Sequence, residues 1–287
     1  MHRISIAVVA ALVAALVLVS LSAAANRSGR ATHRYHRIIS LSPTVTEDLF
    51  AIGAGKQVVA VDNQSNYPKR APRTNLSGYT PNKEAIAKYH PDLVLISYDP
   101  GNFASQLRQL GIKVVFVKAA DNLKQAYGEI LALGRLTGHI HGARAVVRSM
   151  RTHLAAIVAS VPQTRRHLRV YHELDPTYYS ATSSTFIGSV YKLFGFRDIA
   201  DAAGGTGGGY PQLSGEYIVA KNPQIIVLAD TRCCGQSYSS VSSRPGWSTV
   251  SAVQHHRVFG ANDDVASRWG PRIVQFARSV ARIAKQG

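Results

Sequence analysis

Acidic residues, cysteines and catalytic motifs are all scarce in this chain. Its 16 Asp and Glu residues face 33 Lys and Arg residues, so the formal net charge of the 287 residues is +17 at pH 7. No GxSxG, P-loop or HExxH sequence occurs. The basic residues are scattered and no zinc-finger spacing appears, which argues against nucleic-acid binding. We therefore expect a protein that is not an enzyme and whose ligand or neighbours are anionic.

The eleven histidines do not predict a metal site. His139 and His141 are two residues apart, which points them to different sides of a helix, and His255 and His256 stand in a polar turn before a strand. We expect no metal ligands in the protein and no cofactor. A receptor for free zinc or manganese, which would need three histidines and a carboxylate from two lobes, stays as the alternative.

The first residues have the layout of a secretory signal peptide. An apolar run follows Arg3 and ends in small residues at Ala23 to Ala25. Residues 1–25 are therefore predicted to be a signal peptide, or else an uncleaved anchor, because the run is close to ~20 residues. No cysteine lies near the cleavage site, so we expect no lipid attachment. The protein is predicted to be exported to the periplasm or the outer face of the cytoplasmic membrane.

One phrase occurs twice in the chain. EAIAKYHPDLVLI begins at Glu84 and EYIVAKNPQIIVL at Glu216, and both have an isoleucine two residues on, a proline seven residues on and then an apolar run. The spacing is 216 − 84 = 132 residues. This is too long for a solenoid repeat and suits a duplicated domain. We therefore expect two similar lobes with a cleft between them.

Short apolar runs without polar alternation predict strands that are covered on both faces. They fall at 37–42, 58–62, 92–97, 113–117, 169–174, 225–230 and 257–261. Helical patterns lie between them, notably at 185–196, 216–222 and 271–285. This alternation is typical of parallel sheets. The GGTGGG segment at 204–209 lacks the flanking strand and helix of a dinucleotide-binding motif, and we interpret it as a hinge or cleft-edge loop.

A long helical region separates the two halves. Gly134, Gly138 and Gly142 interrupt it, so two helices are predicted, the second from about 140 to 160 and roughly 30 Å long. The predicted fold is α/β, with two Rossmann-like lobes joined by a long helical spine and a ligand cleft between them. The predicted boundaries are 26–121 for the N-terminal lobe, 122–161 for the spine and 162–287 for the C-terminal lobe.

Four segments carry a family resemblance: RIISLSPTVTEDLFAIGAG, HPDLVLI, ELDPTYYSATSSTFIGSVYKLFGF and YPQLSGEYIVAKNPQIIVL. They resemble the periplasmic-binding family that serves ABC importers of cobalamin, ferric siderophores and haem, in its helical-backbone class. Cobalamin-binding proteins are closest in motif. The resemblance runs from about Arg37 to Ala284. It implies a monomer that captures a metal chelate, containing cobalt or iron, and delivers it to an ABC permease in the membrane.

The resemblance gives the repeated glutamates a role. In the family, an acidic residue on each lobe docks with arginines of the permease, and Glu84 and Glu216 fall at those places. Two surface charges would set the register of the protein on its partner. The alternative is that each carboxylate only complements a helix dipole, which is worth ~0.3 to 1 kcal/mol.

Candidate ligand-binding residues follow the predicted strands, because open α/β sheets bind ligands at the carboxyl ends of their strands. Tyr98 follows one strand, and Tyr79 and Tyr210 precede the two glutamate helices. Their rings would pack on the faces of a macrocycle. By resemblance to cobalamin receptors, Asp264 and Arg268 would face the ligand or form a local salt bridge.

Three further features leave alternatives open. Trp269 either lines the cleft or closes the base of the last helix. Cys233 and Cys234 would form a strained vicinal disulfide, which either touches the ligand or serves as a structural turn. The chain also departs from the cobalamin receptors, because Gln64 stands where a tyrosine is expected and no tryptophan shortly precedes Glu84.

Overall fold

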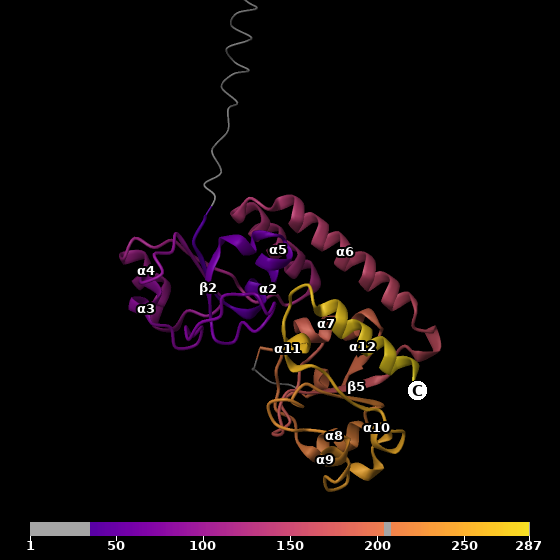
Figure 1. The fold of residues 1–287 in the computed structure, drawn as a ribbon. Coiled ribbons are helices and arrows are strands. Elements are labelled where there is room, and N and C mark those ends of the chain that lie inside the picture. The colour runs from indigo at the N-terminus through magenta and orange to yellow at the C-terminus, as the bar shows by residue number, and fades with distance from the viewer. Residues whose placement is uncertain (1–34, 204–207, 287) are drawn as a thin grey trace, which may run out of the picture. The chain divides into compact units, whose positions relative to one another are not determined.

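The computed structural model describes residues 35–203 and 208–286. The predicted signal peptide, and most of the glycine-rich segment at 204–209, lie outside this part of the chain. The described residues form two four-stranded parallel sheets, with strand orders β2-β1-β3-β4 and β6-β5-β7-β8 (Figure 1). The predicted α/β fold with two lobes is confirmed.

The N-terminal sheet consists of apolar runs that are largely buried. Its strands and helices alternate: β1 (Ile38–Leu41), α2 (Pro43–Ala51), β2 (Val58–Val61), α3 (Lys83–Ala87), β3 (Leu93–Ile96), α4 (Phe103–Gln109) and β4 (Val114–Phe116). Short 3-10 turns lie at Ala54–Gln57 and Pro100–Asn102. Ser42 is the N-cap of α2, and Pro43 begins the helix with its fixed φ.

The C-terminal lobe repeats this order with additions. Its elements are β5 (Arg169–Glu173), α7 (Phe186–Leu193), β6 (Arg197–Asp198), α8 (Gly215–Lys221), β7 (Ile225–Leu228), α9 (Tyr238–Ser242), α10 (Ser251–Gln254), β8 (Val258–Gly260), α11 (Asp263–Ser267) and α12 (Ile273–Lys285). Its 3-10 turns lie at Gln163–Arg165, Ile199–Ala202 and Trp247–Thr249. The two-residue strand β6 and the short helices α9, α10 and α11 were not predicted from the sequence.

Two helices connect the sheets, α5 (Leu123–Thr137) and α6 (Ile140–Ala159). Gly138 ends α5 with φ of 77°, a conformation that glycine adopts without strain. The prediction of two helices, the second about 30 Å long, is therefore confirmed. None of the helices within 35–203 and 208–286 has the length and apolar character needed to cross a membrane.

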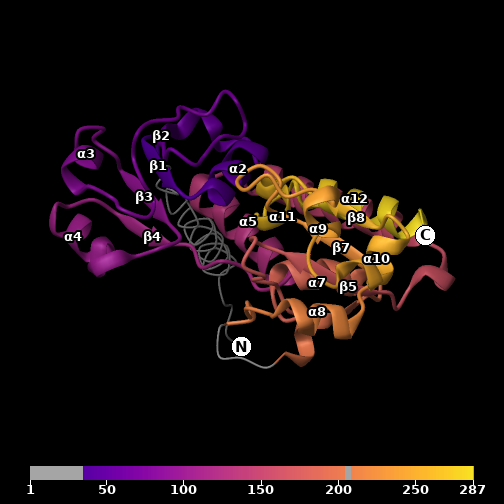
Figure 2. The same cartoon turned by 90° about the horizontal axis from the view of Figure 1, so that it is seen from below.

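Each sheet is covered on both faces (Figures 1 and 2). One continuous core covers one face of both sheets and includes side chains from α2, α5, α6, α7 and α12. A second core lies between the C-terminal sheet and the helices α8, α9 and α10. A third lies between the N-terminal sheet and the helices α3 and α4. The glutamate-bearing helices α3 and α8 therefore lie on the opposite sheet faces from α6 and α12.

The repeated phrase has the same structure in both lobes. Each pairing of β1 with β3, such as Ile38 with Leu93, recurs 132 residues later between β5 and β7. Arg37 Nε donates hydrogen bonds to two carbonyls at the end of α3, and Arg169 Nε does the same at the end of α8. The repeat thus extends beyond the thirteen residues to the arginine that binds the end of each helix.

Candidate functional site

Two tyrosines lie together at the carboxyl edge of the N-terminal sheet. Tyr98 comes two residues after β3 and is 53% exposed, and Tyr79 precedes α3 and is 72% exposed. Their ring centroids are 6.1 Å apart. Gly78 permits this placement, because a Cβ there would lie 2.5 Å from the carbonyl oxygen of Leu41 at the end of β1. The pair offers ring faces to a ligand at this edge.

A short ribbon places two more tyrosines at the corresponding edge of the C-terminal lobe. Segments 178–182 and 209–213 are joined by backbone hydrogen bonds, and Tyr179 and Tyr210 are each 41% exposed. Burial raises the pKa of Tyr210, and the carboxylate of Asp121 adds to the rise. The hydroxyl of Tyr210 therefore stays protonated at neutral pH and is available as a hydrogen-bond donor.

Asp264 and Arg268 form a pair that reaches the N-terminal lobe. Arg268 Nη2 donates to Asp264 Oδ1 at 2.8 Å, and Nη1 donates to Asn66 Oδ1 at 2.9 Å. Asn66 Nδ2 donates in turn to Asp264 Oδ2 at 2.9 Å. The side chain of Arg268 is only 10% exposed. The two residues are adjacent, as the resemblance implies, but protein groups occupy much of their hydrogen-bonding capacity, and ligand contact by them stays a prediction.

Glu47 on α2 binds two arginines of the C-terminal lobe. Arg268 Nη1 donates to Glu47 Oε1 at 2.8 Å, and Arg272 Nε donates to Glu47 Oε2 at 2.7 Å. The guanidinium carbon of Arg272 also lies 4.3 Å from the ring centroid of Tyr67. Glu47 is buried, so its negative charge depends on these two cations. We call Glu47, Arg268 and Arg272 the lobe junction.

Two further carboxyls lie beside the lobe junction, Asp48, which is buried, and Glu129, which is half-buried. Burial raises the pKa of Glu129 to about 7. Burial also raises the pKa of Asp48 well above its ordinary value, with the nearby charges of Glu129 and Glu47 adding to the rise. Trp269 Nε1 donates to Glu129 Oε2 at 2.9 Å, and its indole ring packs on the main core. Of the two readings of Trp269, this packing favours the one at the base of the last helix.

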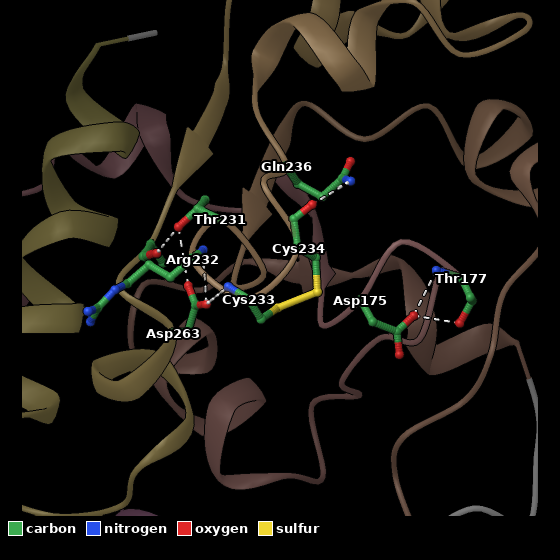
Figure 3. The surroundings of a disulfide bond; sticks show 9 residues. Asp175, Thr177, Thr231, Arg232, Cys233, Cys234, Gln236 and Asp263 are labelled. Atoms are coloured by element: carbon green, nitrogen blue, oxygen red, sulfur yellow. Dashed lines mark hydrogen bonds between the residues drawn. A yellow bond between two sulfur atoms is a disulfide. The ribbon is translucent and has the colours of Figure 1, made fainter. Parts of the chain in front are cut away.

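The two cysteines lie in the loop after β7, where the structure joins their sulfur atoms in a disulfide (Figure 3). Asp263 holds this loop, because its Oδ2 accepts hydrogen bonds from the backbone N–H groups of Arg232 at 3.1 Å and Cys233 at 3.2 Å. Figure 3 shows the disulfide facing the turn at 175–177. Both cysteines are exposed at the carboxyl edge of the C-terminal sheet.

A buried ion pair lies at the same edge. Glu173, at the end of β5, is fully buried and accepts hydrogen bonds from both Nη atoms of Arg244, at 2.6 and 2.7 Å. The Arg244 guanidinium carbon lies 4.6 Å from the ring centroid of Trp247 and 5.2 Å from that of Tyr178. Burial, followed by the charge of Glu173, raises the pKa of Asp230 to about 7. The edge therefore holds a network of buried charge.

Glu84 and Glu216 occupy equivalent places in the first turns of α3 and α8. Each helix has an N-cap side chain, Asn82 or Ser214, that accepts a backbone hydrogen bond. Both glutamates are exposed. Hydrogen bonds to its own backbone N–H and to Ser214 lower the pKa of Glu216, so this carboxylate is ionised at neutral pH. Their docking role stays a prediction.

The histidines are dispersed. Across residues 35–203 and 208–286, no group of three His, Cys, Asp or Glu side chains is placed to hold a metal ion. His172 lies in the core, where Nδ1 is 2.7 Å from the Tyr191 hydroxyl, and burial lowers its pKa to about 3. Asp263 accepts hydrogen bonds from the backbone N–H groups of Arg232 and Cys233, whereas Asp264 accepts from the side chains of Arg232 and Arg268.

Several site residues were not predicted from the sequence. Tyr179 is not among the predicted ligand-binding residues, although it lies in the short ribbon opposite Gln212. Glu47 resembles an ordinary solvated acid in the first turns of α2. No signal in the sequence marks it, because the burial of Thr44, Val45, Thr46 and Asp48 around it is seen only in the structure. Arg244 lies 71 residues from its partner.

Comparison with known proteins agrees with this architecture. The profile of the periplasmic binding protein family matches residues 38–265. The chain belongs to the periplasmic binding protein family. This binding protein is 31% identical over 273 residues to an uncharacterized ABC transporter substrate-binding lipoprotein of Bacillus subtilis, a match that covers 92% of the chain and 84% of the relative.

Two further matches carry ligand names. The cobalamin-binding protein of Halobacterium salinarum is 32% identical over 247 residues, and this match covers 83% of the present chain but spans only 66% of that protein's length. The crystal structure of the periplasmic vitamin B12 binding protein of Vibrio cholerae superposes with a TM-score of 0.70 and 25% identity, covering 88% of this chain and 99% of that one. The two-lobed fold is thus shared along nearly the whole described chain.

Proposed function

We propose that this binding protein is the substrate-binding component of an ABC importer and that its ligand is a corrinoid such as cobalamin. The observation that carries the proposal is the set of exposed tyrosines at the carboxyl edges of both sheets, Tyr79 and Tyr98 on one lobe and Tyr179 and Tyr210 on the other. The names of the relatives from Halobacterium salinarum and Vibrio cholerae support the choice of ligand.

The chemistry of a corrinoid suits these groups. Its flat macrocycle offers faces on which tyrosine rings pack, and the Tyr79–Tyr98 pair presents two such rings. Its amide side chains need both donors and acceptors, which Asn66, Asp264 and Arg268 supply next to each other. The cobalt belongs to the ligand in this proposal, and the protein contributes no metal ligand of its own.

The protein acts by binding and release. Its relatives are binding proteins, so we propose stoichiometric capture without turnover, by a monomer that is exported to the periplasm or the outer face of the cytoplasmic membrane. The ligand is then delivered to a permease in that membrane. A receptor for free zinc or manganese is the competing assignment.

Titration of the purified protein tests the ligand. We expect cyanocobalamin to quench tyrosine and tryptophan fluorescence with one-to-one saturation, more tightly than haem, a ferric siderophore or zinc chloride. Y98A and Y210A each remove a stacking ring, and we expect a loss of affinity of about tenfold for each. L110A is the matched control, because Leu110 is also 53% exposed but follows α4. Saturable binding of zinc without quenching by any chelate would favour the metal-ion assignment.

Charge reversal tests docking. Because Glu84 and Glu216 are exposed at matched helix starts, we expect E84K/E216K to abolish uptake by the permease while cyanocobalamin affinity stays at the wild-type value. K113E/K192E is the control, since it reverses one exposed charge on each lobe outside both helices. Weakened ligand binding by E84K/E216K would place these residues in the site instead.

A further inference from the structure

Two helices carry the same line of positive charges. The sequence spacing i, i+4 and i+7 occurs in both, and it puts each set on one flank of its helix. The residues are Arg144, Arg148 and Arg151 on α6, and Arg278, Arg282 and Lys285 on α12. All six are exposed. Neither helix contains an aspartate or a glutamate.

The two lines lie on different sides of the exposed ridge of α6. The guanidinium carbon of Arg151 lies 4.9 Å from the ring centroid of Tyr127, so the line on α6 lies on the flank of α6 next to α5. Arg278 lines a groove of about 590 Å³ together with Ser149 and His153, so the line on α12 lies beside the other flank of α6. Helices α6 and α12 pack against each other (Figure 1). The two lines therefore flank the exposed ridge of α6, and we call this ridge together with its two flanking lines the α6–α12 face.

Few acids are available to neutralise this face. The sequence contains no Asp or Glu between Glu129 and Glu173, and none after Asp264. Glu129 itself is half-buried and accepts the hydrogen bond of Trp269. The ion pairs among the described residues use other cations than these six. With a formal net charge of +17 for the whole chain, this face attracts polyanions.

The α6–α12 face lies away from the docking glutamates. Helices α6 and α12 belong to the core that covers one face of both sheets, whereas α3 and α8 cover the opposite faces. A partner on the α6–α12 face would therefore leave Glu84, Glu216 and the tyrosines at the sheet edges free. Binding there is compatible with ligand capture and with docking on a permease.

We propose that the α6–α12 face binds a linear phosphodiester polymer of the cell envelope and so retains the exported protein near its transporter. Guanidinium groups bind phosphate oxygens in a bidentate manner, and Arg144 to Arg151 form a line of roughly 10 Å along which successive phosphates can bind. A lipid bilayer fits less well, because interfacial helices insert bulky apolar side chains, and the exposed positions of α6 hold Arg, His, Ser, Thr and Ala.

The experiment uses fluorescently labelled poly(glycerol phosphate) as the probe and measures its anisotropy at a series of NaCl concentrations. We expect R144Q/R148Q/R151Q to bind at least about tenfold more weakly at low salt. The slope of log K against log salt should fall by about 2, because each lost phosphate contact contributes about 0.7. R144K/R148K/R151K keeps the charges and should retain most of the affinity.

The matched control removes three charges from the other side of the N-terminal sheet. Lys88, Arg108 and Lys113 are exposed, and K88Q/R108Q/K113Q should bind the polymer nearly as well as the wild type. Equal losses of polymer affinity in R144Q/R148Q/R151Q and K88Q/R108Q/K113Q would overturn the proposal. Tighter binding to duplex DNA or to phosphatidylglycerol vesicles than to the polymer would also overturn it. Titration of the same variants with cyanocobalamin is a separate measurement, so a failure of the polymer proposal can be told apart from a failure of the proposed ligand.

Discussion

Glu173 has no contact with solvent, and its charge is balanced by Arg244, whose side chain is 11% exposed. E173Q would leave the arginine charge largely buried without its carboxylate. Removing one partner of a buried pair costs about 3 to 5 kcal/mol. We therefore expect the free energy of unfolding, measured by urea denaturation, to fall by about that amount.

The control for this prediction is an ion pair at the surface. Lys83 and Glu84 are 4.0 Å apart, with side chains that are 41% and 68% exposed. Exposed pairs contribute about 0 to 1 kcal/mol, so E84Q should hardly change the unfolding free energy. Equal losses of unfolding free energy in E173Q and E84Q would show that the buried pair of Glu173 and Arg244 contributes no more to stability than the exposed pair.

At the same residue scale, the sequence located side chains that follow from topology and missed those that depend on distant contacts. Tyr98 and Tyr210 could be placed at sheet edges because strand ends and helix starts are visible in the apolar pattern. Glu47 could not be recognised, because its two arginines lie more than two hundred residues away in the chain. Local periodicity carries no information about such pairs.

At the scale of elements, the contact between α5 and Trp269, in the segment between α11 and α12, predicts a pH dependence. Burial raises the pKa of Glu129 from an ordinary 4.5 to about 7. The folded state therefore binds a proton more tightly than the unfolded state. The resulting stabilisation is complete below about pH 4.5 and is lost as the pH rises through about 7.

E129Q removes this titration while its amide oxygen can still accept the hydrogen bond from Trp269. We expect the variant to gain stability relative to the wild type between pH 5 and pH 8, by up to about 3 kcal/mol. Urea denaturation of both proteins across this range measures the difference. A constant difference at all pH values would mean that Glu129 does not titrate between pH 5 and pH 8.

His172 acts in the opposite direction, because its pKa is lowered in the folded state. The stability that this shift contributes is lost only as the pH falls below about 6.5.

Most elements were predictable because their signals are long or repeated. The core strands have unbroken apolar runs, and the shared register of β1–β3 and β5–β7 follows from the duplicated phrase. The two-residue β6 is too short to show a period of two. Helices α9 and α11 have five residues each and lie in polar segments, so no apolar stripe distinguishes them from loops.

For the whole molecule, two kinds of contact join the lobes. One is apolar, because a single core includes side chains from both sheets and from α5 and α6. The other is the lobe junction, in which one buried carboxylate of α2 binds two arginines beyond α11. The first kind resists sliding of the helices through close packing, and the second fixes orientation through directional hydrogen bonds. The duplicated sequence predicts two lobes and a spine but not the junction, since Glu47 and Arg272 lie outside the repeated phrase.

E47Q tests the lobe junction. It leaves Arg268 and Arg272 with side chains only 10% and 14% exposed and without their shared carboxylate. We expect a loss of about 3 to 5 kcal/mol in the free energy of unfolding. We also expect faster amide hydrogen exchange around Asn66, whose side chain is hydrogen-bonded to Arg268 and Asp264. K118Q is the control, because Lys118 forms an exposed pair with Asp121 that should contribute under about 1 kcal/mol. Unchanged exchange around Asn66 in an E47Q protein of reduced stability would mean that Glu47 stabilises α2 locally and does not hold the lobes together.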